Sequence, residues 1–293
     1  MILRPLVACL LILSTAYSQR SVSQTRPPIR VAVVGFGSGA PPAIAAVLGA
    51  ALEGAGRVSI VEPSMFGPAL AALGYEGSLN MSADEARRLG AAIGCDFFII
   101  GKAEVLTRSE RAKELHQEAL LAVMIVDGRI GALAAFDLIT EKAQTSEKAL
   151  AAASTALAGR ASGYVGQMTN FRASRESLTA SPQRSDIERI EEMPVEGSPQ
   201  ARGFKPPEFL SRVKPEYTAE AERADVTATI EANVVLRSSG EVGEVEITRW
   251  AGFGLEESAL RAIRQFKFNP ATRNGQAVNV RAMIRYNFRR VGQ

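Results

Sequence analysis

The sequence has little histidine and cysteine: among 293 residues there is one histidine, His116, and there are two cysteines, Cys9 and Cys95. These counts exclude a histidine-based metal cage, a pair of catalytic histidines, a four-cysteine zinc site and a disulfide framework. Aromatic residues make up only 6% of the chain, with one tryptophan, which argues against a sugar-stacking surface. The net charge is also small, because 34 basic and 31 acidic residues leave +3. This balance does not indicate a nucleic-acid binder.

Hydrophobic residues make up 46% and charged residues 22% of the chain, which is ordinary globular composition. At roughly 100–200 residues per domain, the length predicts two domains.

Residues 1–18 have the pattern of an export signal. Arg4 precedes an apolar run over residues 6–13, and Ala16 and Ser18 satisfy the small-x-small rule for cleavage before Gln19. The run is far shorter than the ~20 residues that span a bilayer. Two alternatives remain: a lipoprotein box ending at Cys9, and an uncleaved segment that keeps the protein at the membrane. We expect an exported, periplasmic protein with Cys95 as its one remaining thiol.

The pattern of apolar residues over residues 29–172 predicts an α/β domain with a mixed sheet. Apolar runs over residues 29–37, 58–61 and 95–106 indicate buried strands, and helical patterns separate them. Ser82 to Glu85 form a capping box that begins a helix ending at Gly94. Residues 119–126 and 132–138 predict a hairpin that turns near Asp127-Gly128, and residues 145–171 predict one long helix. This order favours a three-layer arrangement.

Residues 173–206 are rich in charge and proline and poor in large apolar side chains. We expect a flexible linker with at most a passing helical turn at Ile187 and Ile190. The linker predicts that residues 29–172 and 207–293 fold independently.

Residues 207–293 predict a small α+β domain of order β-β-α-β. Apolar residues alternate with mostly polar ones over residues 226–236 and again over 278–288, as in strands with one wet face. Leu255, Ala259, Ile263 and Phe266 mark one amphipathic helix. Asn274-Gly275 is a strong tight-turn signal.

Three features could carry chemistry. The turn from Gly35 to Ala40 fits G-x-G-x-x-[GA], and Glu62 closes the next strand, as in a dinucleotide site. The alternative is a glycine-rich strand-to-helix turn that binds nothing, and we favour it because no second mononucleotide half follows. We expect His116 to be a surface strand residue and Cys95 a small apolar core residue.

Residues 207–293 resemble the TonB C-terminal domain over about 80 residues in the family's order. The motifs are Pro215-Glu216-Tyr217, the Val234 to Val245 turn region with Gly240, Leu255 to Ile263, Phe266 to Ala271, Gly275, and the closing Tyr286-Asn287-Phe288. The resemblance departs from the family at Thr218, where a proline is usual. It departs again in beginning with a short signal rather than a membrane-spanning helix.

The resemblance implies a periplasmic domain that docks an envelope or outer-membrane partner of the TonB-dependent receptor type. The resemblance implies that the partner's extended peptide adds as a strand to the sheet, as part of TonB-dependent transmembrane transport, and we predict the strand over residues 277–288 as the docking edge. The alternative is an interior strand. The predicted partner-binding residues are Pro215, Tyr217, Val280, Arg281, Ala282, Met283, Ile284 and Arg285. Arginines on the polar face would favour an acidic or mixed peptide.

Residues 29–172 also resemble the CsgG and TolB N-terminal type of envelope domain. The features are residues 31–36, the Leu89-Gly90 helix leading into the strand from Cys95 to Gly101, and Val126-Asp127. Domains of that type are non-catalytic parts of envelope assemblies.

We therefore expect a non-enzymatic envelope protein with no catalytic residues, no cofactor, no metal, no small-molecule substrate and no nucleic-acid partner. The alternatives are a periplasmic assembly or scaffold protein without energy transduction, and a nucleotide-dependent oxidoreductase that uses the Gly35 turn.

Overall fold

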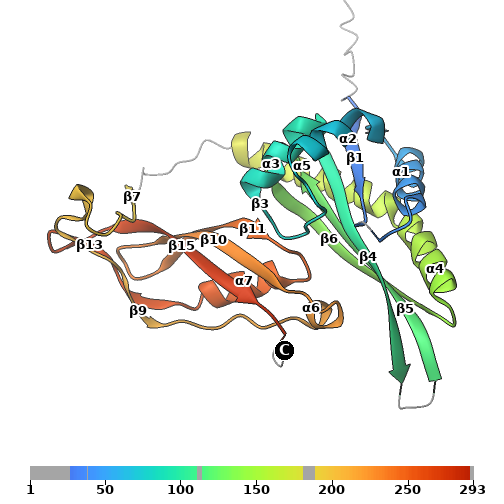
Figure 1. Cartoon of the computed structure of the whole chain (residues 1–293). Helices are drawn as coiled ribbons and strands as arrows, with labels where there is room; N and C mark the ends of the chain where they lie inside the picture. Colours follow the sequence, from blue (N-terminus) through green and yellow to red (C-terminus); the bar gives the residue numbers. More distant parts are fainter. Residues whose placement is uncertain (1–26, 38, 111–113, 181–188, 291–293) are drawn as a thin grey trace, which may run out of the picture.

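The computed structural model describes residues 27–37, 39–110, 114–180 and 189–290 as two domains side by side (Figure 1). The expected signal over residues 1–18, with Cys9 and the cleavage site before Gln19, lies outside the described residues. Within those ranges, no helix has the length and apolar character needed to cross a membrane.

The N-terminal domain contains a mixed five-stranded sheet of order β2-β1-β4-β5-β6. Its strands are β1 (Ile29–Gly35), β2 (Val58–Ile60), β4 (Phe97–Glu110), β5 (Glu114–Asp127) and β6 (Ala132–Ala143). β1 runs parallel to β2 and β4, while β4, β5 and β6 are antiparallel. The mixed sheet and the hairpin turn after Asp127 are confirmed, although β4 and β5 are longer than the apolar runs predicted.

Helices cover both faces of this sheet. One face packs on α1 (Ala43–Ala55), α4 (Ser146–Gly159) and α5 (Ala161–Ala180), and the other packs on α2 (Pro63–Ala72) and α3 (Ala83–Ile93). The capping box of α3 is confirmed, because the Ser82 side chain accepts from the Glu85 N–H and Glu85 accepts from the Ser82 N–H. The single helix predicted over residues 145–171 is wrong, because α4 ends at Gly159 and α5 begins after Arg160.

The C-terminal sheet has the order β3-β11-β10-β15-β7. Its long strands are β10 (Ala228–Leu236), β11 (Val242–Trp250) and β15 (Asn279–Phe288), and α7 (Leu255–Ile263) lies between β11 and β15 in the chain. Alternate residues of β10 and β15, among them Val234, Val280 and Ile284, pack with Ile263 of α7 in one core. The predicted β-β-α-β order and both parts of the fold class are confirmed.

Short strands border this sheet. They are β3 (Met81–Ser82), β7 (Ile190–Glu192), β8 (Phe204–Lys205), β9 (Glu208–Ser211), β12 (Lys267–Asn269), β13 (Thr272–Arg273) and β14 (Gln276–Ala277), with a 3₁₀ helix η1 (Pro199–Ala201) and the short helix α6 (Ala219–Arg223). The Asn274-Gly275 turn joins β13 to β14, with φ of 50° and 86° at these two residues, as a type I′ hairpin requires.

The two domains share a hydrophobic core, so the expectation that they fold independently is wrong. Phe98, Ile100 and Met124 of the N-terminal sheet lie in one cluster with Trp250 and Phe253 of the C-terminal domain. β3, from the N-terminal part of the chain, pairs with the end of β11. The physical reason is that α2 and α3 leave part of this apolar sheet face uncovered, and the C-terminal domain covers it.

Individual residues show how closely the two domains pack against each other. The Trp250 indole N–H donates to the Gly131 carbonyl at 3.0 Å, and the Phe136 and Phe253 ring centroids are 4.6 Å apart. Gly252 has φ of 76°, and a Cβ added there would lie 2.4 Å from the Phe136 ring. A side chain at this position would therefore strain the backbone and require the Phe136 and Met124 side chains to shift.

Glu256 is a buried carboxylate that orders the same loop. It accepts backbone hydrogen bonds from Ala251 at 2.5 Å and Gly252 at 2.8 Å. Burial raises the pKa of Glu256, and the two backbone donors partly offset this by favouring the ionised form. Glu256 is therefore a structural anchor for the residues that meet the N-terminal domain.

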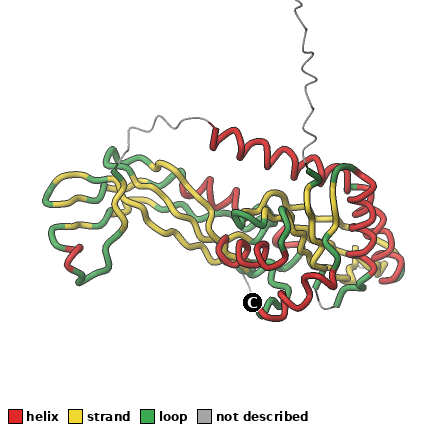
Figure 2. The backbone as a smooth tube through the Cα atoms, turned by 90° about the horizontal axis from the view of Figure 1, so that it is seen from above, coloured by secondary structure: helices red, strands yellow, loops and turns green. Residues whose placement is uncertain are grey.

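The structure differs from the flexible linker expected over residues 173–206. Residues up to Ala180 continue α5, Ile190 lies in β7 rather than a helical turn, and residues 199–205 include η1 and β8. Ile187 lies outside the described residues. Figure 2 shows the strands of the C-terminal domain on the left and most helices of the N-terminal domain on the right.

Candidate functional site

β15 carries most of the predicted partner-binding residues, and it is not a free edge along its whole length. It pairs with β10 from Ala228↔Phe288 to Leu236↔Val280. On its other side it pairs in parallel with β7, from Asn279↔Ile190 to Arg281↔Glu192. The prediction of a free docking edge over residues 277–288 is therefore wrong for Asn279 to Arg281, because a segment expected to be a linker pairs there.

The outer side of β15 is open beyond the end of β7. In the part of the chain that the structure describes, no strand pairs with residues 282–288 on the side opposite β10. Here Met283 is 61% exposed and Arg285 is exposed, whereas Ile284 is buried beneath the sheet. This stretch keeps the unpaired backbone groups that a docking peptide needs.

The arginines expected to attract an acidic peptide already have acidic partners. Arg281 contacts Glu192 of β7 at 2.8 Å, and Arg285 contacts Glu231 of β10 at 2.7 Å. Glu231 in turn lies 3.6 Å from Arg249. Arg285 and Arg249 thus share Glu231 on the polar face of the sheet, and the separate Arg281–Glu192 pair joins β15 to β7.

Pro215 and Tyr217 lie in the loop between β9 and α6, before the central strands begin. The Tyr217 hydroxyl lies 3.0 Å from the Ala221 carbonyl and 2.8 Å from the Val226 carbonyl. The ring packs on the core that the domains share. These contacts give Tyr217 a local structural role, and its part in partner binding stays a prediction, as does that of Pro215.

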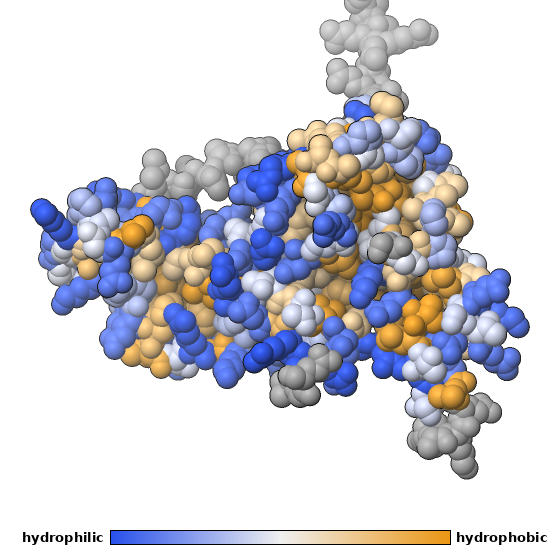
Figure 3. All heavy atoms as spheres, viewed as in Figure 1, coloured by the Kyte–Doolittle hydropathy of each residue, from blue (hydrophilic) through white to orange (hydrophobic). Residues whose placement is uncertain are grey.

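Sequence reasoning missed the residues that hold β7 in place. Arg273 of β13 contacts Glu191 at 2.7 Å and donates to the Gln200 carbonyl at 3.0 Å. In Figure 3, hydrophilic residues dominate the left end of the molecule, where β7 and β13 lie. Glu191 and Glu192 were the one sequence feature that could have indicated this contact. Two adjacent acidic residues in a charged segment do not by themselves predict a strand or an ion pair.

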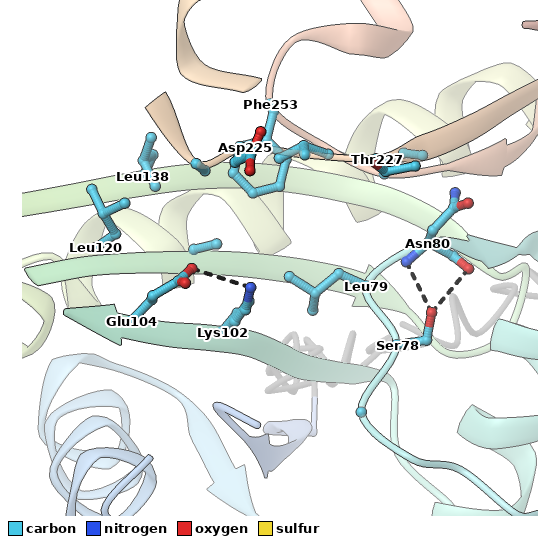
Figure 4. A pocket seen from close by; sticks show the side chains of 16 residues that line it. Ser78, Leu79, Asn80, Lys102, Glu104, Leu120, Leu138, Asp225, Thr227 and Phe253 are labelled. Atoms are coloured by element: carbon cyan, nitrogen blue, oxygen red, sulfur yellow. Dashed lines mark hydrogen bonds and ion pairs between the residues drawn. The ribbon is translucent and has the colours of Figure 1, made fainter. Parts of the chain in front are cut away.

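A pocket of about 240 Å³ lies between the two domains (Figure 4). Lys102 and Glu104 of β4 form an ion pair across 3.1 Å, and Leu120 and Phe253 supply apolar walls. The lysine and the carboxylate neutralise one another. The pocket thus has no excess charge from this pair to attract a charged ligand.

A larger cavity of about 620 Å³ lies at the Gly35 turn, whose sequence fits the glycine pattern of a dinucleotide site. Gly35 and Gly37 have positive φ, and Ser38 lies outside the described residues. Glu53 and Glu62 line the cavity, and none of its described lining residues is basic. Two carboxylates without a cation disfavour a pyrophosphate, so the electrostatics favour the turn that binds no nucleotide.

His116 and Cys95 show no catalytic arrangement. His116 lies half-buried on β5 opposite Arg108, and its Nε2 has no hydrogen-bond partner among the described residues. Cys95 is 7% exposed, as expected of a core residue. Burial, with the nearby Asp96 charge adding to it, raises the pKa of Cys95 to about 12, which keeps the thiol protonated and unreactive.

The C-terminal domain matches a known family. Residues 213–289 match the family described as Gram-negative bacterial TonB protein C-terminal, which confirms the resemblance stated for this region. A comparison of the chain with curated proteins finds no match.

Several solved structures resemble parts of the chain. The TonB C-terminal domain of Pseudomonas aeruginosa is 13% identical, covers 36% of this chain and 98% of its own, and has a TM-score of 0.28. LpoB of E. coli is 15% identical, with coverage of 40% of this chain and 57% of its own, at a TM-score of 0.28. PelC of Paraburkholderia phytofirmans is 13% identical, with coverage of 46% and 86%, at a TM-score of 0.29. Similarity at this level says nothing about function, and nothing here supports the CsgG and TolB N-terminal resemblance.

Proposed function

We propose that this protein, whose residues 213–289 are a TonB C-terminal domain, docks an envelope or outer-membrane partner by strand addition along β15. The observation that carries the proposal is the position of the open edge: residues 282–288 lie within the region that matches the family. The family match supports a location in the cell envelope, and we propose the periplasm as the compartment and a protein of the TonB-dependent receptor type as the partner. The role is binding rather than catalysis.

The expected complex is weak and transient. A ladder of about four or five hydrogen bonds at ~0.5–1.5 kcal/mol each supplies only a few kcal/mol. Micromolar binding requires about 8 kcal/mol, so side-chain contacts must contribute. Met283 is the exposed apolar side chain on the open stretch of β15 and is suited to such a contact.

An assembly or scaffold role without energy transduction is the second candidate. The core shared by Phe98 and Met124 with Trp250 supports it, because a domain packed on its neighbour holds a partner at a fixed position. Such a domain cannot move freely relative to the N-terminal domain, as one on a long flexible linker would. Both candidate functions include docking along β15. They differ in whether the docked complex takes part in transport.

Site-specific photo-cross-linking in cells tests the docking site. A photoreactive residue in place of Met283 should form a discrete adduct with an envelope protein. The matched control places it at Leu115 of β5, which is 74% exposed but belongs to the N-terminal sheet, and it should not give that adduct. An adduct from Leu115 alone, or the same adduct from both positions, would contradict docking along β15.

A further inference from the structure

β7 occupies the part of the docking edge where β15 begins. Its three residues run parallel to β15, and Ile190, Glu191 and Glu192 lie opposite Asn279, Val280 and Arg281. β7 is therefore bound as an added strand, in the geometry that an incoming peptide would adopt. The occupant is a segment of the same chain.

Two ion pairs hold β7, one to Arg273 of β13 and one to Arg281 of β15, and their side chains differ in solvent exposure. Glu191 and Arg273 are 15% and 30% exposed, and Arg273 also lies over the Phe204 ring at 5.2 Å. Glu192 and Arg281 are 71% and 42% exposed, so water competes for the second pair. β7 thus has one sheltered acidic contact and one exposed acidic contact.

β7 is three residues long, whereas β15, with which it pairs, is ten residues long. β7 covers only Asn279 to Arg281, whereas residues 282–288 continue the same strand without a partner on that side among the described residues. A longer segment could form ladder bonds along the whole of β15. A partner strand that makes more bonds than β7 can replace it.

We propose that Ile190 to Glu192 act as an internal competitor that occupies the first part of the docking edge, Asn279 to Arg281, until an acidic, extended partner segment displaces them. This inference rests on the proposed function and adds the partner's chemistry: a strand parallel to β15 with two successive acidic residues that reach Arg273 and Arg281. A tethered occupant acts at a high effective concentration, so the closed edge lowers the partner's apparent affinity in proportion to the open fraction.

Binding of a peptide with the sequence of residues 189–196 tests this competition. The fluorescently labelled peptide is titrated into the full chain and followed by anisotropy. The double variant Glu191→Ala/Glu192→Ala weakens the internal strand and should bind the peptide about tenfold or more tightly than the unaltered chain. The control Glu196→Ala removes an exposed acidic side chain outside β7 and should leave the affinity unchanged.

A disulfide between β7 and β15 has the opposite effect to the double alanine variant, because it prevents β7 from leaving the strand edge. Arg281 and Glu192 are directly paired, and neighbouring strands lie ≈ 4.8 Å apart, within the Cα separation that a disulfide spans. The oxidised Glu192→Cys/Arg281→Cys chain should not bind the peptide, and reduction should restore binding. Cys95 is buried and does not compete for the new bond.

Equal affinity of the unaltered chain and the double alanine variant would overturn the inference, as would binding to the oxidised chain. If the peptide results fail while the Met283 adduct persists, β7 does not compete and the proposed docking stands. If the peptide results hold while the Met283 adduct is absent, the internal competitor stands and the proposed envelope docking is wrong.

Discussion

Replacing Trp250 with alanine should lower the free energy of unfolding by about 3–5 kcal/mol, the range for removing a large buried aromatic side chain. Trp250 is 1% exposed and lies where β11 pairs with Met81 of β3. Its indole N–H donates to Gly131 at 3.0 Å, across the two domains. The variant would leave a cavity in the shared core and an unpaired buried carbonyl.

Urea denaturation followed by circular dichroism measures this effect. The matched variant Trp250→Phe keeps an aromatic ring but loses the donor, so it should cost less than alanine, with the lost hydrogen bond worth about 1 kcal/mol. Both domains should lose stability together, because each contributes to the core around this side chain. A Trp250→Ala variant within about 1 kcal/mol of the unaltered protein would contradict the shared core.

Replacing Asn80 with alanine should cost about 2–4 kcal/mol, because three hydrogen bonds to backbone groups are lost at ~1 kcal/mol or more each. The Asn80 side-chain amide donates to the Thr229 carbonyl at 2.8 Å and the Trp250 carbonyl at 2.9 Å. Its oxygen accepts from the Thr229 N–H at 3.0 Å. One side chain of the N-terminal domain thus joins the ends of β10 and β11.

Thermal and urea unfolding of two control variants isolate these contacts. Ser78→Ala alters the same loop, but its hydroxyl bonds only to Asn80 itself, at an exposed position, so a change within about 0.5 kcal/mol is expected. Asn80→Asp can still accept from Thr229 but places a carboxylate against two carbonyl oxygens, so it should be at least as harmful as alanine. An alanine variant as stable as Ser78→Ala would show that Asn80 does not hold the domains.

The sequence correctly predicted those helices, turns and strands whose formation depends on residues close together in the chain. The capping box from Ser82 to Glu85, the type I′ turn at Asn274-Gly275, and the alternation along β10 and β15 each depend on residues close in the chain. The fold class followed from these elements and from their order. The break between α4 and α5 was missed, because the apolar stripe continues across Arg160 and only the backbone changes there.

The shared core and the closed edge could not be read from the sequence. Successive apolar residues such as Phe97 and Phe98 showed that both faces of β4 are buried, but not that a second domain covers part of one face. β7 is three residues long, too short for a periodic pattern, and it pairs with a strand far along the chain. Its position depends on Arg273 and Arg281, whose contacts exist only in the folded sheet.

Only some of the predicted partner-binding residues lie where a partner strand could pair. Met283 and Arg285 lie on the open stretch of β15, whereas Val280 and Arg281 are paired with β7 and Tyr217 lies in a separate loop. The alternation located the strand correctly. It could not determine which neighbours the strand has, because burial of one face is the same for an interior strand and an edge strand.

Hydrogen exchange of the β15 backbone amides, in the full chain alone and with the purified protein captured through Met283, tests docking along β15 most directly. Strand addition predicts that amides within residues 282–288 exchange more slowly in the complex, while those of β4 and β5 are unchanged. If protection instead appears only in the N-terminal domain and β15 exchanges at its unbound rate, the protein does not dock its partner through this strand.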